Sequence, residues 1–235
     1  MASRTRARPP SLLESIQRLL ERTYRMQSGI EDPGRFVIGD RGYALLYAGQ
    51  ETTETVTPAG VADGAGARML VRESSDCLRA CIYYPDQLIE HLERFPPQHG
   101  VGEENVDAFA ALVEELDHLL LLAERTRNRR PVTLFELELH ANVSKHLVLT
   151  RFLAGDRGSL PADQRLWLRH QLFQKDTFCH GNPEVRQRYR DATQWAVRLL
   201  DRLAGLPVPA RIDTLRRFHE EAVQGKLELI RELED

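Results

Sequence analysis

The sequence has 235 residues, of which 42% are hydrophobic and 29% are charged, and its formal net charge is −3 at pH 7. A chain of this length and composition can bury a core of its own and is not intrinsically disordered. The slightly negative charge argues against a generally cationic nucleic-acid-binding protein.

The ends of the sequence and its cysteines narrow the class of protein further. Residues 1–10 are basic and predict a short disordered arm, and no apolar signal core follows them. No apolar run approaches the roughly 20 residues that span a bilayer, so we expect a cytoplasmic protein. Three cysteines are too few for a disulfide framework or a four-cysteine zinc site. We interpret Cys179, which precedes His180, as an ordinary loop cysteine.

Residues 11–100 predict an α+β subdomain. A capping box, Ser11 to Glu14, opens a helix over 12–26, in which apolar residues recur at helical spacing. Short apolar runs bounded by turn residues then predict strands over 36–38, 43–47, 69–71 and 78–84, the last two as a hairpin. Residues 50–67 are rich in Thr, Gly and Ala and predict a weak edge pair or a loop. A short helix over 85–95 ends this part.

Residues 101–235 predict a predominantly α-helical bundle that packs with the first part as one unit. Helices are expected over 105–125, 134–153 and 162–175, from Asn182-Pro183 onward, around 212–222, and after Gly225. The fold class is therefore α+β: an N-terminal helix and a small, mainly antiparallel sheet, followed by helices.

The first candidate for chemistry is Glu115-Leu-Asp-His118. The Glu-x-x-His spacing places a carboxylate and an imidazole on one helix face, as in helical di-metal proteins, but those need two copies and this chain has one. On a helical wheel His118 falls roughly opposite the apolar stripe, which favours a solvent-facing side chain. Leu121 and Leu122, however, make the same helix apolar all round at its C-terminal end, so this far face can also be covered. A structural or solvent-facing His118 is therefore favoured over a metal ligand.

The second candidate is the segment from Glu136 to His140. Thr133 and Glu136 form a capping box that favours a helix, whereas the alternation of apolar and polar residues over 133–140 would also suit a strand. A strand would bring Glu136, Glu138 and His140 onto one face. The alternative functional hypothesis is a metal-dependent hydrolase or oxidoreductase with Glu115, His118, Glu138 and His140 as ligands of a divalent metal.

The third candidate is the arginine-rich turn between the two long central helices. Arg127, Arg129 and Arg130 form an exposed basic surface that would suit an acidic protein partner or, less well, nucleic acid phosphates. Phosphate-loop, dinucleotide-binding and serine-hydrolase motifs are absent. We therefore favour a non-catalytic binding or adaptor protein that acts through a protein partner and needs no cofactor.

Overall fold

The structure is a computed structural model that describes residues 9–47, 66–74, 77–175 and 182–234. Most of the predicted arm, most of the segment 50–67, and Cys179 with His180 lie outside these ranges. The predicted fold class is confirmed: the chain is mostly helical, with a small sheet in its N-terminal part. Among the described residues, no helix is long and apolar enough to cross a membrane.

Helix α1 (Leu12–Tyr24) begins where the capping box predicts. The Ser11 amide donates to Glu14 Oε2 at 2.6 Å, and the Glu14 amide donates to Ser11 Oγ at 3.2 Å. These two bonds satisfy amides that the first helical turn leaves without partners. The buried face of α1, which includes Ile16 and Leu20, packs against the central helices and α8 (Val208–Glu220).

The sheet has three strands in the order β1 (Val37–Ile38), β3 (Cys77–Tyr83) and β2 (Arg68–Ser74). The antiparallel pairing of β2 with β3 confirms the predicted hairpin, from Arg68 opposite Tyr83 to Ser74 opposite Cys77. The sheet is nevertheless mixed, because β1 runs parallel to β3. The 3-10 turn Pro33–Phe36 leads into β1.

The strand predicted over 43–47 is wrong, because these residues belong to helix α2 (Asp40–Tyr47). Ala44, Leu45 and Leu46 are consecutive apolar residues, and a short run without alternation does not distinguish a strand from a helix. The Tyr43 amide bonds to the Gly39 carbonyl at 2.9 Å, which starts the helical pattern.

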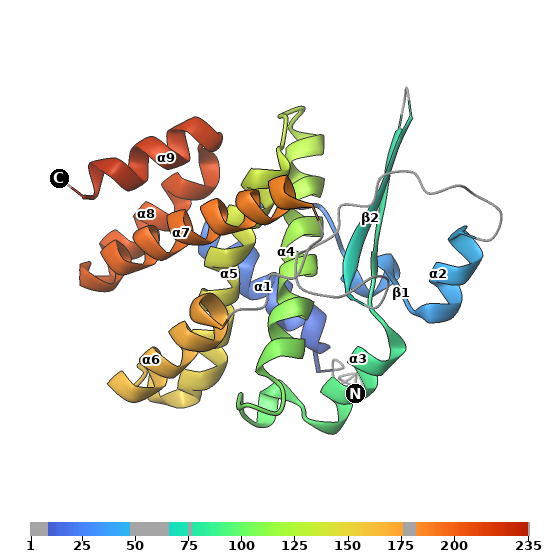
Figure 1. Cartoon of the computed structure of the whole chain (residues 1–235), viewed down its shortest axis with the longest axis horizontal. Coiled ribbons are helices and arrows are strands. Elements are labelled where there is room, and N and C mark those ends of the chain that lie inside the picture. Colours follow the sequence, from blue (N-terminus) through green and yellow to red (C-terminus); the bar gives the residue numbers. More distant parts are fainter. Residues whose placement is uncertain (1–8, 48–65, 75–76, 176–181, 235) are drawn as a thin grey trace, which may run out of the picture.

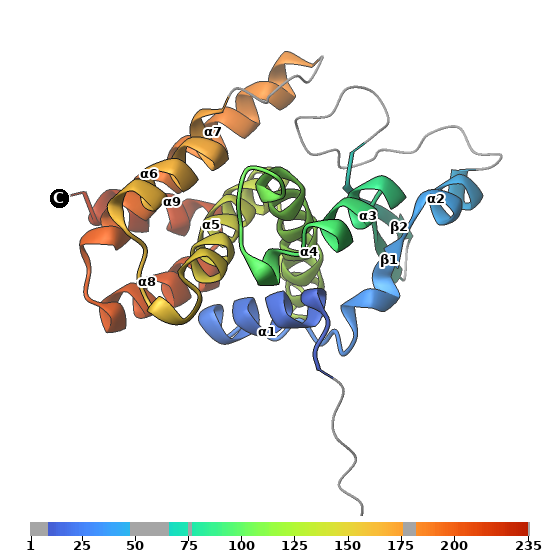
Figure 2. The same ribbon diagram turned by 90° about the horizontal axis from the view of Figure 1, so that it is seen from below.

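Helices α4 (Val106–Arg127) and α5 (Leu134–Ala154) lie at the centre of the molecule. Figures 1 and 2 place the sheet, α2 and α3 (Asp86–Arg94) on one side of them, and α6 to α9 on the other. The helical interpretation of residues 133–140 is confirmed, and the Glu136 amide bonds to Thr133 Oγ1 at 3.1 Å. One hydrophobic cluster joins residues from both predicted subdomains.

Four further helices enclose α5 and complete the core. They are α6 (Ala162–Arg169), followed directly by a π-helical turn (His170–Gln174), then α7 (Pro183–Gly205), α8, and α9 (Val223–Glu232). Two short 3-10 turns, Pro97–His99 and Gly155–Arg157, lead toward α4 and away from α5. The central pair is therefore covered on several sides, which determines where its polar side chains lie.

Candidate metal centre

The central helices bury ionisable side chains along much of their length. Most of these groups are less than 3% exposed: Glu115, Asp117, His118, Arg125, Glu136, Glu138 and His140. Buried charges are rare unless they are paired or hold a metal. Of the two alternatives for the far face of α4, solvent exposure of His118 is wrong, because its side chain is fully buried and that face is covered. The buried ionisable side chains of α4 and α5 are therefore candidates for a functional site.

Three of the ionisable groups form a cluster that spans both helices. Glu114 and His118 lie one turn apart on α4, and Glu138 faces them from α5. One carboxylate oxygen from each glutamate and one imidazole nitrogen of His118 lie within 4.8 Å of one another. Residues four apart share a helix face, so the spacing of Glu114 and His118 is what brings them together. We call Glu114, His118 and Glu138 the Glu/His cluster.

Several polar atoms of this cluster have no hydrogen-bond partner in the structure. They are both ring nitrogens of His118 and Glu138 Oε1, and the adjacent Glu115 Oε2 is likewise unpartnered. Glu115 Oε2 lies 3.6 Å from His118 Nδ1, which is an ion-pair distance too long for a hydrogen bond. Buried polar atoms normally have hydrogen-bond partners, so the unpartnered atoms mark the Glu/His cluster as a group that could hold a metal ion.

The outer side of the cluster is well supported. Lys145 Nζ lies 2.5 Å from Glu114 Oε2, and both side chains are only slightly exposed. The Tyr189 hydroxyl of α7 donates a hydrogen bond to Glu138. These contacts hold the two carboxylates in place beside His118.

The electrostatics of the cluster favour a positive charge at its centre. Burial alone would lower the pKa of His118, but the surrounding carboxylates of Glu115, Glu138 and Glu114 outweigh burial and raise that pKa to about 10. Burial raises the pKa of Glu138 to about 8, although the His118 charge opposes the shift. Burial also raises the pKa of Glu115. Protons therefore accumulate where a metal cation would bind.

His140 lies in a different cluster from His118. Its Nδ1 is 2.8 Å from Asp117 Oδ2, its Nε2 is 3.0 Å from His219 Nδ1, and His219 Nε2 is 2.6 Å from Glu124 Oε2. We call these four residues the Asp–His–His–Glu chain. Residues two apart on a helix point about 200° apart, so Glu138 and His140 face opposite sides of α5. The structure therefore separates His140 from the other three proposed ligands.

The Asp–His–His–Glu chain joins α4, α5 and α8 through the core. Each of its three contacts needs one hydrogen between two acceptor atoms, so its two imidazoles together hold one proton more than two neutral rings would. Burial raises the pKa of Asp117, but the charge of His140 outweighs this effect and lowers it. Burial lowers the pKa of His219. One shared positive charge between two carboxylates therefore stabilises the packing of α8.

The arginine-rich turn is partly committed to main-chain contacts. Arg127 Nη1 donates to the Gln27 carbonyl at 3.4 Å, and Arg130 Nη2 donates to the Glu220 carbonyl at 2.5 Å. Arg129 is exposed, with a positive φ of 52°. The expectation that Arg127, Arg129 and Arg130 bind a protein partner or nucleic acid stays a prediction.

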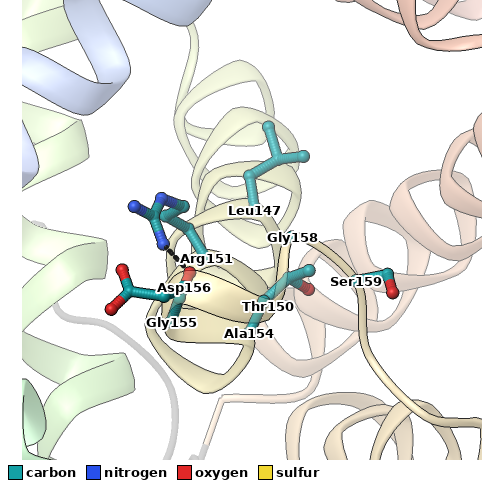
Figure 3. A pocket seen from close by; sticks show the side chains of 8 residues that line it. All are labelled: Leu147, Thr150, Arg151, Ala154, Gly155, Asp156, Gly158 and Ser159. Carbon is teal, nitrogen blue, oxygen red and sulfur yellow. Dashed lines mark hydrogen bonds between the residues drawn. The ribbon is translucent and has the colours of Figure 1, made fainter.

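One hollow among the described residues lies away from both clusters. It has a volume of about 500 Å³ and lies at the C-terminal end of α5, beside residues 155–159. Figure 3 shows Thr150, Asp156 and Ser159 around it, with Arg151 bonded to the Gly155 carbonyl. None of its lining residues belongs to the Glu/His cluster.

Sequence reasoning found part of each cluster. The ligand set predicted from the sequence does not include Glu114, although its Glu-x-x-x-His spacing to His118 is visible in the sequence. Tyr189 and His219 come from helices far along the chain, and no local pattern indicates their positions.

Comparisons with protein-family models, with curated proteins and with solved structures found no match for this chain. The function is therefore argued from the geometry of the described residues.

Proposed function

We propose that this protein binds a divalent transition-metal ion in its helical core, with Glu114, His118 and Glu138 as ligands. The observation that carries the proposal is the convergence of unpartnered buried atoms from two helices on one point. Two carboxylate oxygens and one imidazole nitrogen form a donor set that suits zinc, iron or manganese.

The charge balance supports a cation rather than an empty polar core. Lys145 and Tyr189 engage Glu114 and Glu138 from outside, and Glu138 Oε1 has no hydrogen-bond partner in the described part of the chain. Leaving a buried polar group unsatisfied costs about 1–3 kcal/mol, and more when the group is charged. A bound metal ion would satisfy several of these atoms at once.

Three protein ligands leave at least one coordination position for water or a small substrate. Neither hollow identified among the described residues is lined by a member of the cluster. A reaction at this centre would therefore act on molecules small enough to enter a closed helical core, such as water or dioxygen. Of the two alternatives, the closed surroundings favour an oxidoreductase over a hydrolase of bulky substrates.

The proposal is tested with Co²⁺ alone, whose d–d absorption reports its coordination. We expect the wild-type protein to bind a single equivalent and to develop visible absorption. Glu138→Gln should weaken binding at least tenfold, because it replaces a carboxylate ligand with a neutral group of the same shape. His118→Gln should do the same.

The matched controls are Glu228→Gln and His99→Gln, which change exposed or partly exposed residues outside the cluster. Both should bind Co²⁺ like the wild type, and thermal unfolding establishes that each variant is folded. Equal binding by a folded Glu138→Gln variant and the wild type would contradict the proposed site, as would a wild-type protein that binds no Co²⁺.

A further inference from the structure

A second cavity lies where three helices end. It has a volume of about 270 Å³ and lies between the C-terminal ends of α1, α4 and α8. Four arginines line it, together with a buried carboxylate and a buried imidazole: Arg25, Arg125, Arg127, Arg130, Glu124 and His219. We call it the arginine pocket. It shares no residue with the Glu/His cluster.

The buried groups of this pocket are already paired. Arg125 donates to Glu136 Oε1 at 2.8 Å and to the His219 carbonyl at 2.6 Å. Glu124 accepts from the Gln27 amide at 2.6 Å through one oxygen and contacts His219 through the other. The charged groups in the interior of the pocket are therefore paired with one another, although Arg125 Nε has no hydrogen-bond partner among the described residues.

The rim of the pocket carries unused positive charge. Arg25, Arg127 and Arg130 are exposed there, and Glu220 is the one acidic lining residue besides the paired Glu124. A guanidinium has five N–H donors. Arg127 uses one donor on the Gln27 carbonyl, and Arg130 uses one on the Glu220 carbonyl at the end of α8. The Arg25 side chain makes no hydrogen bond within the described residues. Most of the donors on the rim are thus free.

The backbone holds this rim in an unfavourable conformation. Arg25 (φ 58°) and Arg129 (φ 52°) are the two non-glycine residues with positive φ among the described residues, and both lie at or beside the pocket. Arg25 caps the C-terminus of α1 in the left-handed region, where glycine is the usual residue. Glycine would cap the helix with less backbone strain than arginine does. Capping therefore does not explain why an arginine occupies position 25.

A glycine nearby provides the space for a second guanidinium. Gly29 has φ 72°, and a Cβ atom there would lie 1.6 Å from Arg127 Nη1. Glycine at position 29 therefore allows both the left-handed backbone conformation and the close approach of the Arg127 side chain.

We propose that the arginine pocket binds a small ligand through a phosphate group, with Arg25, Arg127 and Arg130 as its contacts. Guanidinium groups match phosphate oxygens with paired N–H donors. Three guanidinium groups from two separate segments can contact the oxygens of a tetrahedral phosphate from several sides. A planar carboxylate has two oxygens, and fewer guanidinium groups occupy them fully. The small volume suits inorganic phosphate or a small phosphate ester.

The test uses the full-length protein and inorganic phosphate at constant ionic strength, followed by amide chemical shifts in NMR spectra. We expect saturable shifts around residues 25–29 and 124–130. Arg25→Gly should weaken phosphate binding at least tenfold while raising the Tm by about 3 °C, because it relieves the left-handed arginine. Binding lost in a variant that is more stable cannot be attributed to unfolding.

The matched control is Arg190→Ala, which removes the same charge from an exposed position on α7. It should bind phosphate like the wild type. Equal weakening by both substitutions would overturn the proposal in favour of general charge attraction, and so would the absence of saturable binding. Equally tight binding of acetate would overturn the assignment of phosphate. A lower Tm for Arg25→Gly would assign this arginine a structural role instead.

Discussion

At the scale of single residues, His118 and Glu138 couple metal binding to protons. Burial opposes the charge of His118, but its carboxylate neighbours prevail and raise its pKa to about 10, while burial raises the pKa of Glu138 to about 8. Both groups therefore carry a proton at pH 7, and a metal ion must displace these protons.

Metal affinity should consequently rise with pH. Between pH 6 and 8 we expect the affinity for Co²⁺ to increase at least tenfold per pH unit, since each displaced proton contributes about a factor of ten. Isothermal titration calorimetry in buffers of different ionisation enthalpy measures the protons released. A pH-independent affinity with no proton release would contradict the assignment of these two ligands.

His146 provides a separate link between pH and stability. It lies on α5 against Phe173, and burial, with the nearby charge of Arg169, lowers its pKa to about 4. The unfolded chain takes up this proton near pH 6.5, whereas the folded chain resists it until about pH 4. The contribution of neutral His146 to the free energy of unfolding is therefore fully present above pH 6.5. It is lost as the pH falls from 6.5 to about 4.

His146→Gln should remove this contribution to the pH dependence. We expect the wild type to lose about 2–3 kcal/mol more unfolding free energy than the variant between pH 7 and pH 4. Urea unfolding at a series of pH values measures the difference, with His99→Gln as the control at an exposed position. Parallel pH profiles for wild type and His146→Gln would contradict the prediction.

His118 shows what a sequence pattern can and cannot establish about one residue. The apolar stripe of α4 placed His118 on the opposite face, and that geometry is sound, but the opposite face is covered as well. Whether a polar face meets water depends on neighbours that come from elsewhere in the chain. The pairing of Glu114 with His118 was within reach because it needs only the helical repeat.

At the scale of elements, several helix starts were predictable from their caps, whereas one of the short apolar runs was not. Capping residues such as Ser11, Thr133 and Asn182 act within a few residues of themselves, so they indicate helix starts without tertiary information. The run at Tyr43–Tyr47 is short enough to form either a strand or a helix, and its contacts with the rest of the structure determine that it is a helix.

The link between α8 and α9 depends on one buried lysine. Lys226 Nζ donates to the carbonyls of Phe218 at 2.7 Å and Glu221 at 2.5 Å, and lies 3.3 Å from Glu136 Oε1. Its side chain is fully buried. It therefore satisfies the end of α8 and fixes the start of α9 against the central helices.

Lys226→Met should destabilise the protein by about 3 kcal/mol, because it leaves buried acceptors without a donor. The control is Lys175→Met, which removes a surface ion pair with Asp107 and should cost less than about 1 kcal/mol. Hydrogen exchange should report faster opening of α9 in the Lys226 variant. Equal losses in the two variants would contradict this role for Lys226.

At the scale of the whole molecule, the general architecture followed from periodicity, whereas the pairings between distant segments did not. The order of the predicted elements placed a small sheet before a helical bundle, as the structure has them. The parallel pairing of β1 with β3 and the approach of α8 to α5 join segments far apart in the chain. Local sequence carries no signal for such pairings, because they are selected by the packing of the complete core.

The Asp–His–His–Glu chain has a consequence for the order in which parts of the protein fold during synthesis. His219 leaves the ribosome 79 residues after His140. At roughly 5–20 residues per second, this separation corresponds to several seconds of translation. During that interval the hairpin of α4 and α5 exists without the imidazole, the lysine and the carbonyl groups that later enclose its charges. We therefore expect water to hydrate these charges in the nascent hairpin. They can be fully buried only after α8 and α9 have been synthesised and have packed against α5.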